Sequence, residues 1–273
     1  MEKISLMINY LKFRINKRSI ILSLTIGLLL SGLQIIQSLI PIMKFGNLFL
    51  ESPYTKWISI DPFNFSPIIL FVLLPLIASI PSGNVLKEDL DSGIFMHIKN
   101  KFNLNQIIFG YGLFTFISGF ISIFIILTTN FLTYFMFLPN IKPDFLINEN
   151  LLIIRENTLL VELFYEHPFV HGLLSILLTS IWGGLFAILT CAFSIWIKGK
   201  FLSLFSTMIF QIFIMLLNMF LKLPNFVSYV PFDFLRETSP SPTNIKVVFC
   251  ATFITLFLSV TLLIVGRNKK IVW

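Results

Sequence analysis

The sequence predicts an all-α, polytopic integral membrane protein, and three of its properties lead to that fold class. Of the 273 residues, 56% are apolar and only 12% are charged, whereas soluble domains carry about 25% charged residues. Several apolar runs exceed the ~20 residues that a helix needs to cross ~30 Å of hydrocarbon. Strands of ~10 residues with alternating polarity, the mark of a membrane β-barrel, are missing from the pattern, so the spans are expected to be helices.

The N-terminal segment, residues 1–18, is expected to form an amphipathic helix on the membrane surface. Its apolar residues Ile4, Ile8, Leu11 and Ile15 recur at helical spacing, with Lys and Arg around them. A basic amphipathic helix of this kind binds an anionic leaflet. The apolar run that follows has no small-residue cleavage site, so we interpret it as a retained first span and not as a signal peptide.

Six transmembrane helices are expected in a single domain, 1–273. Their approximate bounds are 19–43, 67–83, 107–138, 170–197, 201–221 and 246–265. The third run is longer than a straight crossing requires, so tilt, a kink or an outer end packed against protein must absorb the excess. Pro75 lies inside the second span, where a neighbouring helix can satisfy the carbonyl that proline leaves free.

The charges of the connecting segments predict the orientation. Six spans place both termini on one side together with residues 84–105, and that side carries most of the 20 Lys and Arg residues. Basic residues mark cytoplasmic loops, so both termini are expected to be cytoplasmic. The segments 139–169 and 222–245 are then extracellular loops, the first with a short interfacial helix within 151–164.

Sequence patterns for nucleotide binding and nucleic-acid binding are missing. The stretch closest to a phosphate-binding loop, residues 194–201, lacks its first glycine and the hydroxyl that would hold magnesium. The chain is therefore expected to bind no cofactor itself and to be no enzyme. Its net charge of +7 lies on loops, whereas a nucleic-acid binder gathers basic residues on a folded domain.

Two weaker site patterns were weighed. Glu162, Glu166, His167 and His171 do not form a His-Glu-x-x-His metal motif, so interfacial anchoring is favoured over an intramembrane protease and no metal site is expected. Cys191 and Cys250 lie in apolar runs and predict neither a disulfide nor a metal site.

A stripe of small residues in the fourth span indicates close helix packing. Gly183, Ala187 and Cys191 recur at intervals of four, which places them on one helix face. The partner helix can belong to the same chain or to a second copy. The spans also contain almost no charged side chains, which argues against an ion-coupled transporter.

A short polar island, Gly83–Gly93, separates the second and third spans. It holds Glu88, Asp89 and Asp91, an acidic cluster on the side of the chain that is otherwise basic. We interpret the island as a docking segment for a soluble cytoplasmic partner. The alternative is an ordinary turn, because Asp-Ser-Gly is a common turn sequence.

The motif Leu74–Pro81 followed by Glu88–Gly93 and a basic stretch resembles the permease subunits of ATP-binding-cassette (ABC) exporters, specifically the type-two exporter family of Gram-positive bacteria. The resemblance implies a permease in the bacterial plasma membrane, with a coupling helix at about 88–99. Family members commonly carry an Arg after this helix, whereas here the sequence reads His97–Lys101, and Lys lacks the bidentate fork of Arg.

The resemblance also implies partners. A separate cytoplasmic ABC ATPase dimer would carry ATP and Mg, and a second permease chain, identical or related, would complete the transporter. The coupling residues would be Glu88, Asp89, Leu90, Asp91, Ser92 and Gly93, with the three carboxylates facing basic groups of the ATPase or capping the helix. The expected cargo is an amphipathic antimicrobial peptide, in export or self-immunity, or a lipid-like molecule. A stand-alone membrane immunity or assembly protein without an ATPase partner is the alternative hypothesis.

Overall fold

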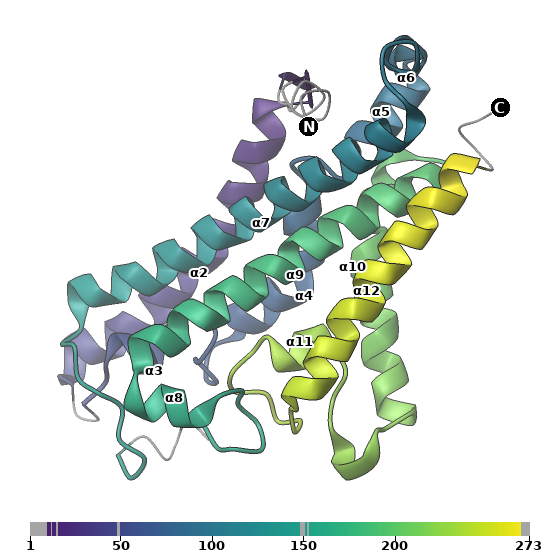
Figure 1. The fold of residues 1–273 in the computed structure, drawn as a ribbon. Coiled ribbons are helices and arrows are strands. Elements are labelled where there is room, and N and C mark those ends of the chain that lie inside the picture. Colours follow the sequence, from purple (N-terminus) through teal and green to yellow (C-terminus); the bar gives the residue numbers. More distant parts are fainter. Residues whose placement is uncertain are drawn as a thin grey trace.

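The computed structural model describes residues 10–11, 13–14, 16–47, 50–147, 151 and 153–268, and these are folded as helices and connecting segments. Residues 1–9, 12 and 15 of the predicted amphipathic helix therefore lie outside the described residues. The helices, labelled in Figure 1, are α2 (Lys17–Phe45), α3 (Pro53–Lys56), α4 (Phe65–Ser79), α5 (Val85–Asp91), α6 (Ile94–Lys99), α7 (Leu104–Phe137), α8 (Val161–Glu166), α9 (Pro168–Trp196), α10 (Lys200–Phe220), the 3₁₀ helix η2 (Pro224–Phe226), α11 (Pro231–Phe234) and α12 (Ile245–Gly266).

Five of these helices, α2, α7, α9, α10 and α12, are long and apolar enough to cross a membrane. This confirms the all-α fold class and the multi-pass character. The predicted second span corresponds to α4, which has only 15 residues. At 1.5 Å per residue it measures about 22 Å, which is shorter than ~30 Å of hydrocarbon.

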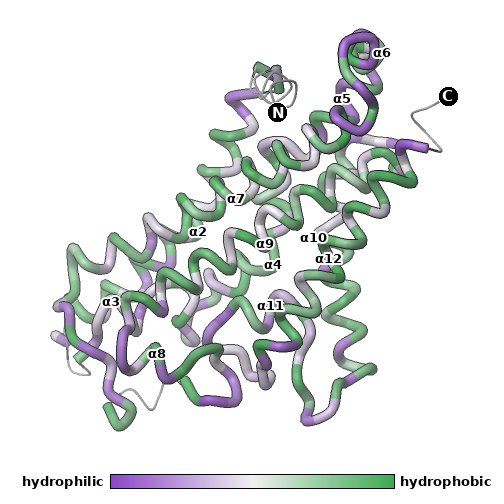
Figure 2. Tube along the Cα trace, in the orientation of Figure 1, coloured by the Kyte–Doolittle hydropathy of each residue, from purple (hydrophilic) through white to green (hydrophobic). Residues whose placement is uncertain are grey.

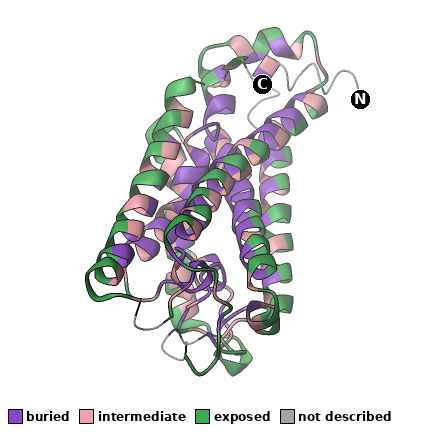
Figure 3. Cartoon of the chain, turned by 90° about the vertical axis from the view of Figure 1, so that its left-hand side faces the viewer, coloured by how far each residue is buried: buried purple, intermediate pink, exposed green. Residues whose placement is uncertain are grey.

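Helix α4 lies inside the bundle and contacts α2, α7, α9 and α10. Its side chains Leu70, Leu74 and Ala78 are fully buried, as the purple interior in Figure 3 illustrates. Pro75 has no N–H to offer the carbonyl of Phe71, four residues earlier. The side-chain amide of Gln211, on α10, donates to that carbonyl at 3.0 Å, so the prediction that a neighbouring helix satisfies it is confirmed.

The small-residue stripe of α9 packs against α7 of the same chain. A Cβ added to Gly119 of α7 would lie 2.7 Å from the Ala187 Cβ and 2.8 Å from the Gly183 carbonyl oxygen. Cys191, farther along the stripe, is buried in the hydrophobic cluster that also contains Tyr111 and Phe114 of α7. The close approach of α7 and α9 thus depends on small residues on both helices.

The bundle has two ends at which polar residues gather (Figures 1 and 2). We call the end that holds α5, α6 and the start of α2 the terminal end, and the end that holds α3, α8 and α11 the loop end. The middle of the long helices is mostly hydrophobic and polar residues gather at both ends. The segment 50–64, which connects α2 to α4, is folded into the loop end, where Trp57, Ile58 and Asp61 are buried.

Candidate functional site

The predicted docking island, Gly83–Gly93, contains the short helix α5, and a second short helix, α6, follows directly after Gly93. Gly93 has φ +76°, in the left-handed region, which glycine enters without the steric cost that other residues meet. The backbone therefore turns at this point and starts a second helix. Phe95 and Ile98 anchor α6 in the hydrophobic cluster of the terminal end, so the pair of helices is fixed to the bundle.

Asp89 is fully buried and points into the protein. Arg14 binds its carboxylate, with the Nε donor 2.9 Å from Oδ1, and the Tyr111 hydroxyl donates to the other oxygen. The hydrogen bond to Asp89 raises the pKa of the Arg14 guanidinium above its ordinary value. The expectation that Asp89 faces a partner is therefore revised: this carboxylate joins α5 to the N-terminal segment and to α7.

Two further side chains of the island join α5 to α9 and α10. The Lys87 ammonium donates to the Ser194 carbonyl at 3.4 Å and to that of Ile197, where a cation is favourable because a helix ends with unpaired carbonyl groups. The Asn84 amide donates to the Lys200 carbonyl at 2.6 Å. Helix α5 therefore has polar contacts with four separate parts of the chain.

The remaining polar residues of the island face outward. Glu88, Asp91, Ser92 and Gly93 are exposed, and Leu90 is half-buried beneath them. The Glu88 side chain is 48% exposed and its ion pair with Lys200 is 3.8 Å long, so that pair contributes at most about 1 kcal/mol. The exposed residues of α5, α6 and their junction, which we call the α5–α6 surface, are Glu88, Asp91, Ser92, Gly93, Met96 and His97.

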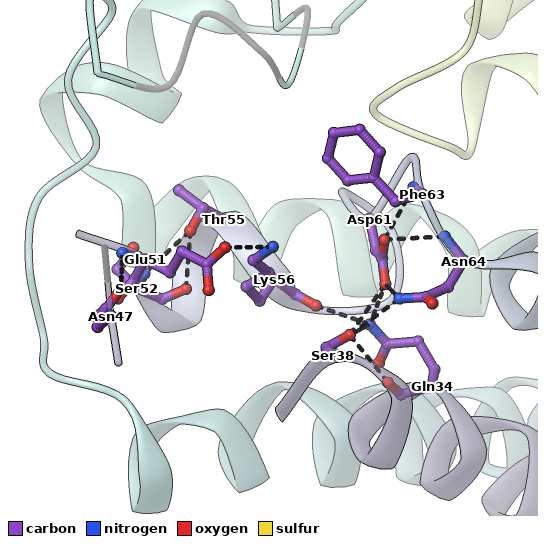
Figure 4. Close-up of polar contacts among 10 residues, drawn as sticks. All are labelled: Gln34, Ser38, Asn47, Glu51, Ser52, Thr55, Lys56, Asp61, Phe63 and Asn64. Atoms are coloured by element: carbon purple, nitrogen blue, oxygen red, sulfur yellow. Dashed lines mark hydrogen bonds and ion pairs between the residues drawn. The ribbon is translucent and has the colours of Figure 1, made fainter. Parts of the chain in front are cut away.

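A second polar cluster lies at the loop end, around the buried carboxylate of Asp61 (Figure 4). It accepts hydrogen bonds from the Gln34 amide at 2.6 Å, the Asn64 amide at 2.6 Å and the Ser38 hydroxyl at 3.2 Å. The backbone N–H groups of Phe63 and Asn64 also donate to it. A buried carboxylate without a cation needs such a full set of donors.

Helix α7 extends this cluster. The Asn130 amide accepts from the backbone N–H of Ile58 at 2.9 Å and donates to Gln34 at 3.1 Å. The Tyr134 hydroxyl also donates to Gln34, at 2.8 Å. The network fixes segment 50–64 against α2 and α7, so α7 packs against protein where it reaches the loop end.

His171 and Glu237 form a smaller buried pair at the same end. Their side chains are 3.7 Å apart, and His171 also contacts the Leu159 carbonyl at 2.9 Å. Burial raises the pKa of the Glu237 carboxyl above its ordinary value. The neighbouring His171 acts in the opposite direction, but the net shift is upward. Within the part of the chain that the structure describes, no three His, Cys, Asp or Glu side chains gather as a metal site would require.

The sequence singled out the island but not the residues that hold it. In the sequence, Arg14 is one of several basic residues in a segment expected to lie on the membrane surface, and Tyr111 is one aromatic residue within an apolar run. Only the fold brings them to Asp89, from 75 and 22 positions away in the chain. Lys87 belongs to the island itself. A lone Lys beside a helix end was the one signal in the sequence that could have identified it as a residue that holds the island in place.

Fold and site together define a multi-pass helical membrane protein with a polar two-helix segment fixed across one end. No known family, curated protein or solved structure matches this chain.

Proposed function

We propose that this chain is the membrane-spanning permease subunit of an ATP-driven ABC exporter in a bacterial plasma membrane. The observation that carries the proposal is the construction of α5. One side of this helix is bound to the N-terminal segment, α7, α9 and α10, while Glu88 and Asp91 on its other side are exposed. A force applied to the exposed side would reach the long helices directly.

The proposal assigns ATP hydrolysis to a separate cytoplasmic ATPase, since the chain has no phosphate-binding loop. Basic groups of the ATPase would meet the α5–α6 surface, and α5 would transmit the movement of the ATPase to the bundle. In this proposal the terminal end is cytoplasmic. In it α4 is the second of six crossings, and its short length is acceptable because α2, α7, α9 and α10 pack against it.

An amphipathic peptide or a lipid-like molecule is the cargo that we propose. An apolar groove of about 530 Å³ runs between α10 and α12 on a floor formed by Trp182 and Phe186 of α9. Lys246 and Gln211 are its main polar residues. A groove of this composition suits a long apolar molecule with a polar end better than a small ion. A second permease chain, identical or related, would complete the pathway.

Co-purification tests the proposal. The tagged chain is extracted in mild detergent from cells that express its native gene neighbourhood, and bound proteins are identified by mass spectrometry. We expect a stoichiometric subunit with a phosphate-binding loop and ATPase activity. Glu88→Lys combined with Asp91→Lys should release this subunit while the chain stays in the membrane.

The matched control is Glu162→Lys combined with Glu166→Lys, which makes the same change in charge on exposed residues of the loop end. The control should retain the ATPase. If the chain is purified alone at low salt, or if both double variants retain the ATPase equally, the docking assignment is wrong and the stand-alone hypothesis takes its place.

A further inference from the structure

A second groove opens at the terminal end, between the start of α7 and the end of α12. Its volume is about 740 Å³, within the ~300–1,000 Å³ usual for ligand sites. Both helices pack on α9, and Ile188 of α9 contributes to the groove between them. The apolar lining residues include Phe109, Gly112 and Leu113 of α7 and Val260, Leu263 and Ile264 of α12.

The lining is apolar except at one end. Asn105 and Gln106 open the α7 side, and Arg267 closes the α12 side. The Arg267 guanidinium donates to the side-chain amide oxygen of Asn105 and, through Nε, to the side-chain amide oxygen of Asn268 at 2.8 Å. Among the ion pairs of the described residues, none involves Arg267. A guanidinium is thus held in place by amides, with its positive charge left for an anion.

The dimensions fit one lipid chain. From Gln106 to Leu113, and from Val260 to Arg267, each wall rises about 10 Å at 1.5 Å per residue. One leaflet of a bilayer supplies about 15 Å of hydrocarbon, half of the ~30 Å core. The groove therefore covers the larger part of an acyl chain, and the polar residues lie where its headgroup would begin.

We propose that this groove is a specific site for an anionic phospholipid. The acyl chain lies against Gly112, Leu263 and Ile188, and the headgroup phosphate accepts hydrogen bonds from Arg267 and the amides of Asn105 and Gln106. A guanidinium suits a phosphate because its N–H groups form a fork that matches two oxygens. Charge complementarity distinguishes this lipid from a zwitterionic one, whose own cation offsets its phosphate.

The position of the site gives it a consequence for the rest of the molecule. Ile108 and Leu263, which line the groove, also belong to the hydrophobic cluster that supports Phe95 and Ile98 of α6. A bound lipid therefore contacts the same packed unit as the two-helix segment. This inference does not depend on the proposed ATPase, since it uses only the groove, its charge and the membrane location of the chain.

Native mass spectrometry of the detergent-purified chain tests the site, with phosphatidylglycerol and phosphatidylcholine of identical acyl chains as probes. We expect the wild type to prefer phosphatidylglycerol. Arg267→Gln should lower its affinity for that lipid about tenfold, the effect of one charge-assisted hydrogen bond. Lys222→Gln removes the same charge from an exposed position at the loop end and should leave the preference unchanged.

A second pair of variants tests the groove itself. A Cβ added to Gly112 would meet only Leu263, at 3.7 Å, and one added to Gly32 of α2 would meet nothing within 4 Å. A side chain can therefore start at both positions without a clash of its Cβ. Gly112→Leu is expected to fill the groove and to reduce binding of both lipids, whereas Gly32→Leu should not. Any one of three results would overturn the proposal. The wild type could bind the two lipids equally, Arg267→Gln could keep the preference unchanged, or the two Leu variants could bind lipid equally.

Discussion

Replacement of Asp89 by Asn tests whether this carboxylate holds α5 to the bundle. The change keeps the size of the side chain but removes its charge, leaving Arg14 and Tyr111 without their anionic acceptor. Loss of one partner from a buried ion pair costs about 3–5 kcal/mol. The Arg14 side chain is 31% exposed, so water compensates part of that loss and we expect about 2 kcal/mol.

This change in free energy is large enough to measure by thermal unfolding in detergent. At roughly 2–4 °C per kcal/mol for a chain of about this size, Asp89→Asn should lower the Tm by roughly 4–8 °C. Asp91→Asn makes the same chemical change on an exposed residue two positions away and should stay within about 0.5 kcal/mol of the wild type.

A double-mutant cycle with Arg14→Gln identifies the cause. The interaction energy between the two positions should be about 1–3 kcal/mol, as expected for direct contacts. An interaction energy near zero, or equal Tm values for Asp89→Asn and Asp91→Asn, would refute the reasoning that Asp89 is an internal anchor.

Three further predictions concern the bundle and its loop end. Gly119→Ala should destabilise the chain by about 1–3 kcal/mol through overpacking, because its Cβ would lie 2.7 Å from Ala187; Gly32→Ala, in open space, should be neutral in the same thermal assay. Asp61→Ala leaves several buried donors unpaired, and each unpaired donor should lower the free energy of unfolding by about 1–3 kcal/mol. A Tm equal to that of the wild type would contradict the network. The raised pKa of Glu237 means that the folded chain binds this proton more tightly than the unfolded chain. Its stabilising contribution is therefore complete below pH 4.5, the ordinary pKa, and declines as the pH rises through the raised value. The Tm difference between Glu237→Gln and the wild type should then grow in favour of the variant with rising pH, and a constant difference would exclude this explanation.

The long helices were predictable because bilayer-spanning runs are a direct property of composition. The bounds of α9, Pro168–Trp196, differ little from the predicted 170–197. That a neighbouring helix satisfies the carbonyl left free by Pro75 was predictable from the cost of a free carbonyl, but the sequence did not identify Gln211 as the donor.

The depth of individual polar residues was not predictable. Glu88, Asp89 and Asp91 are equivalent in the sequence, yet one is fully buried and two are exposed. What separates them is the position of Arg14 and Tyr111, which only tertiary structure decides. The same applies to segment 50–64, where the polar Asp61 is buried together with Trp57 and Ile58. Its burial is possible because Gln34 and Asn130, from two membrane helices, satisfy its polar groups.

The central claim, that the α5–α6 surface docks an ATPase, is tested most directly by photo-crosslinking in living cells. A photoreactive amino acid replaces Ser92, or replaces Glu162 at the loop end as the control; both positions are exposed. The proposal predicts a crosslinked product from position 92 that contains a soluble subunit with a phosphate-binding loop, and none from position 162. A chain that forms no such product from position 92, or forms it equally from both, would contradict the proposal.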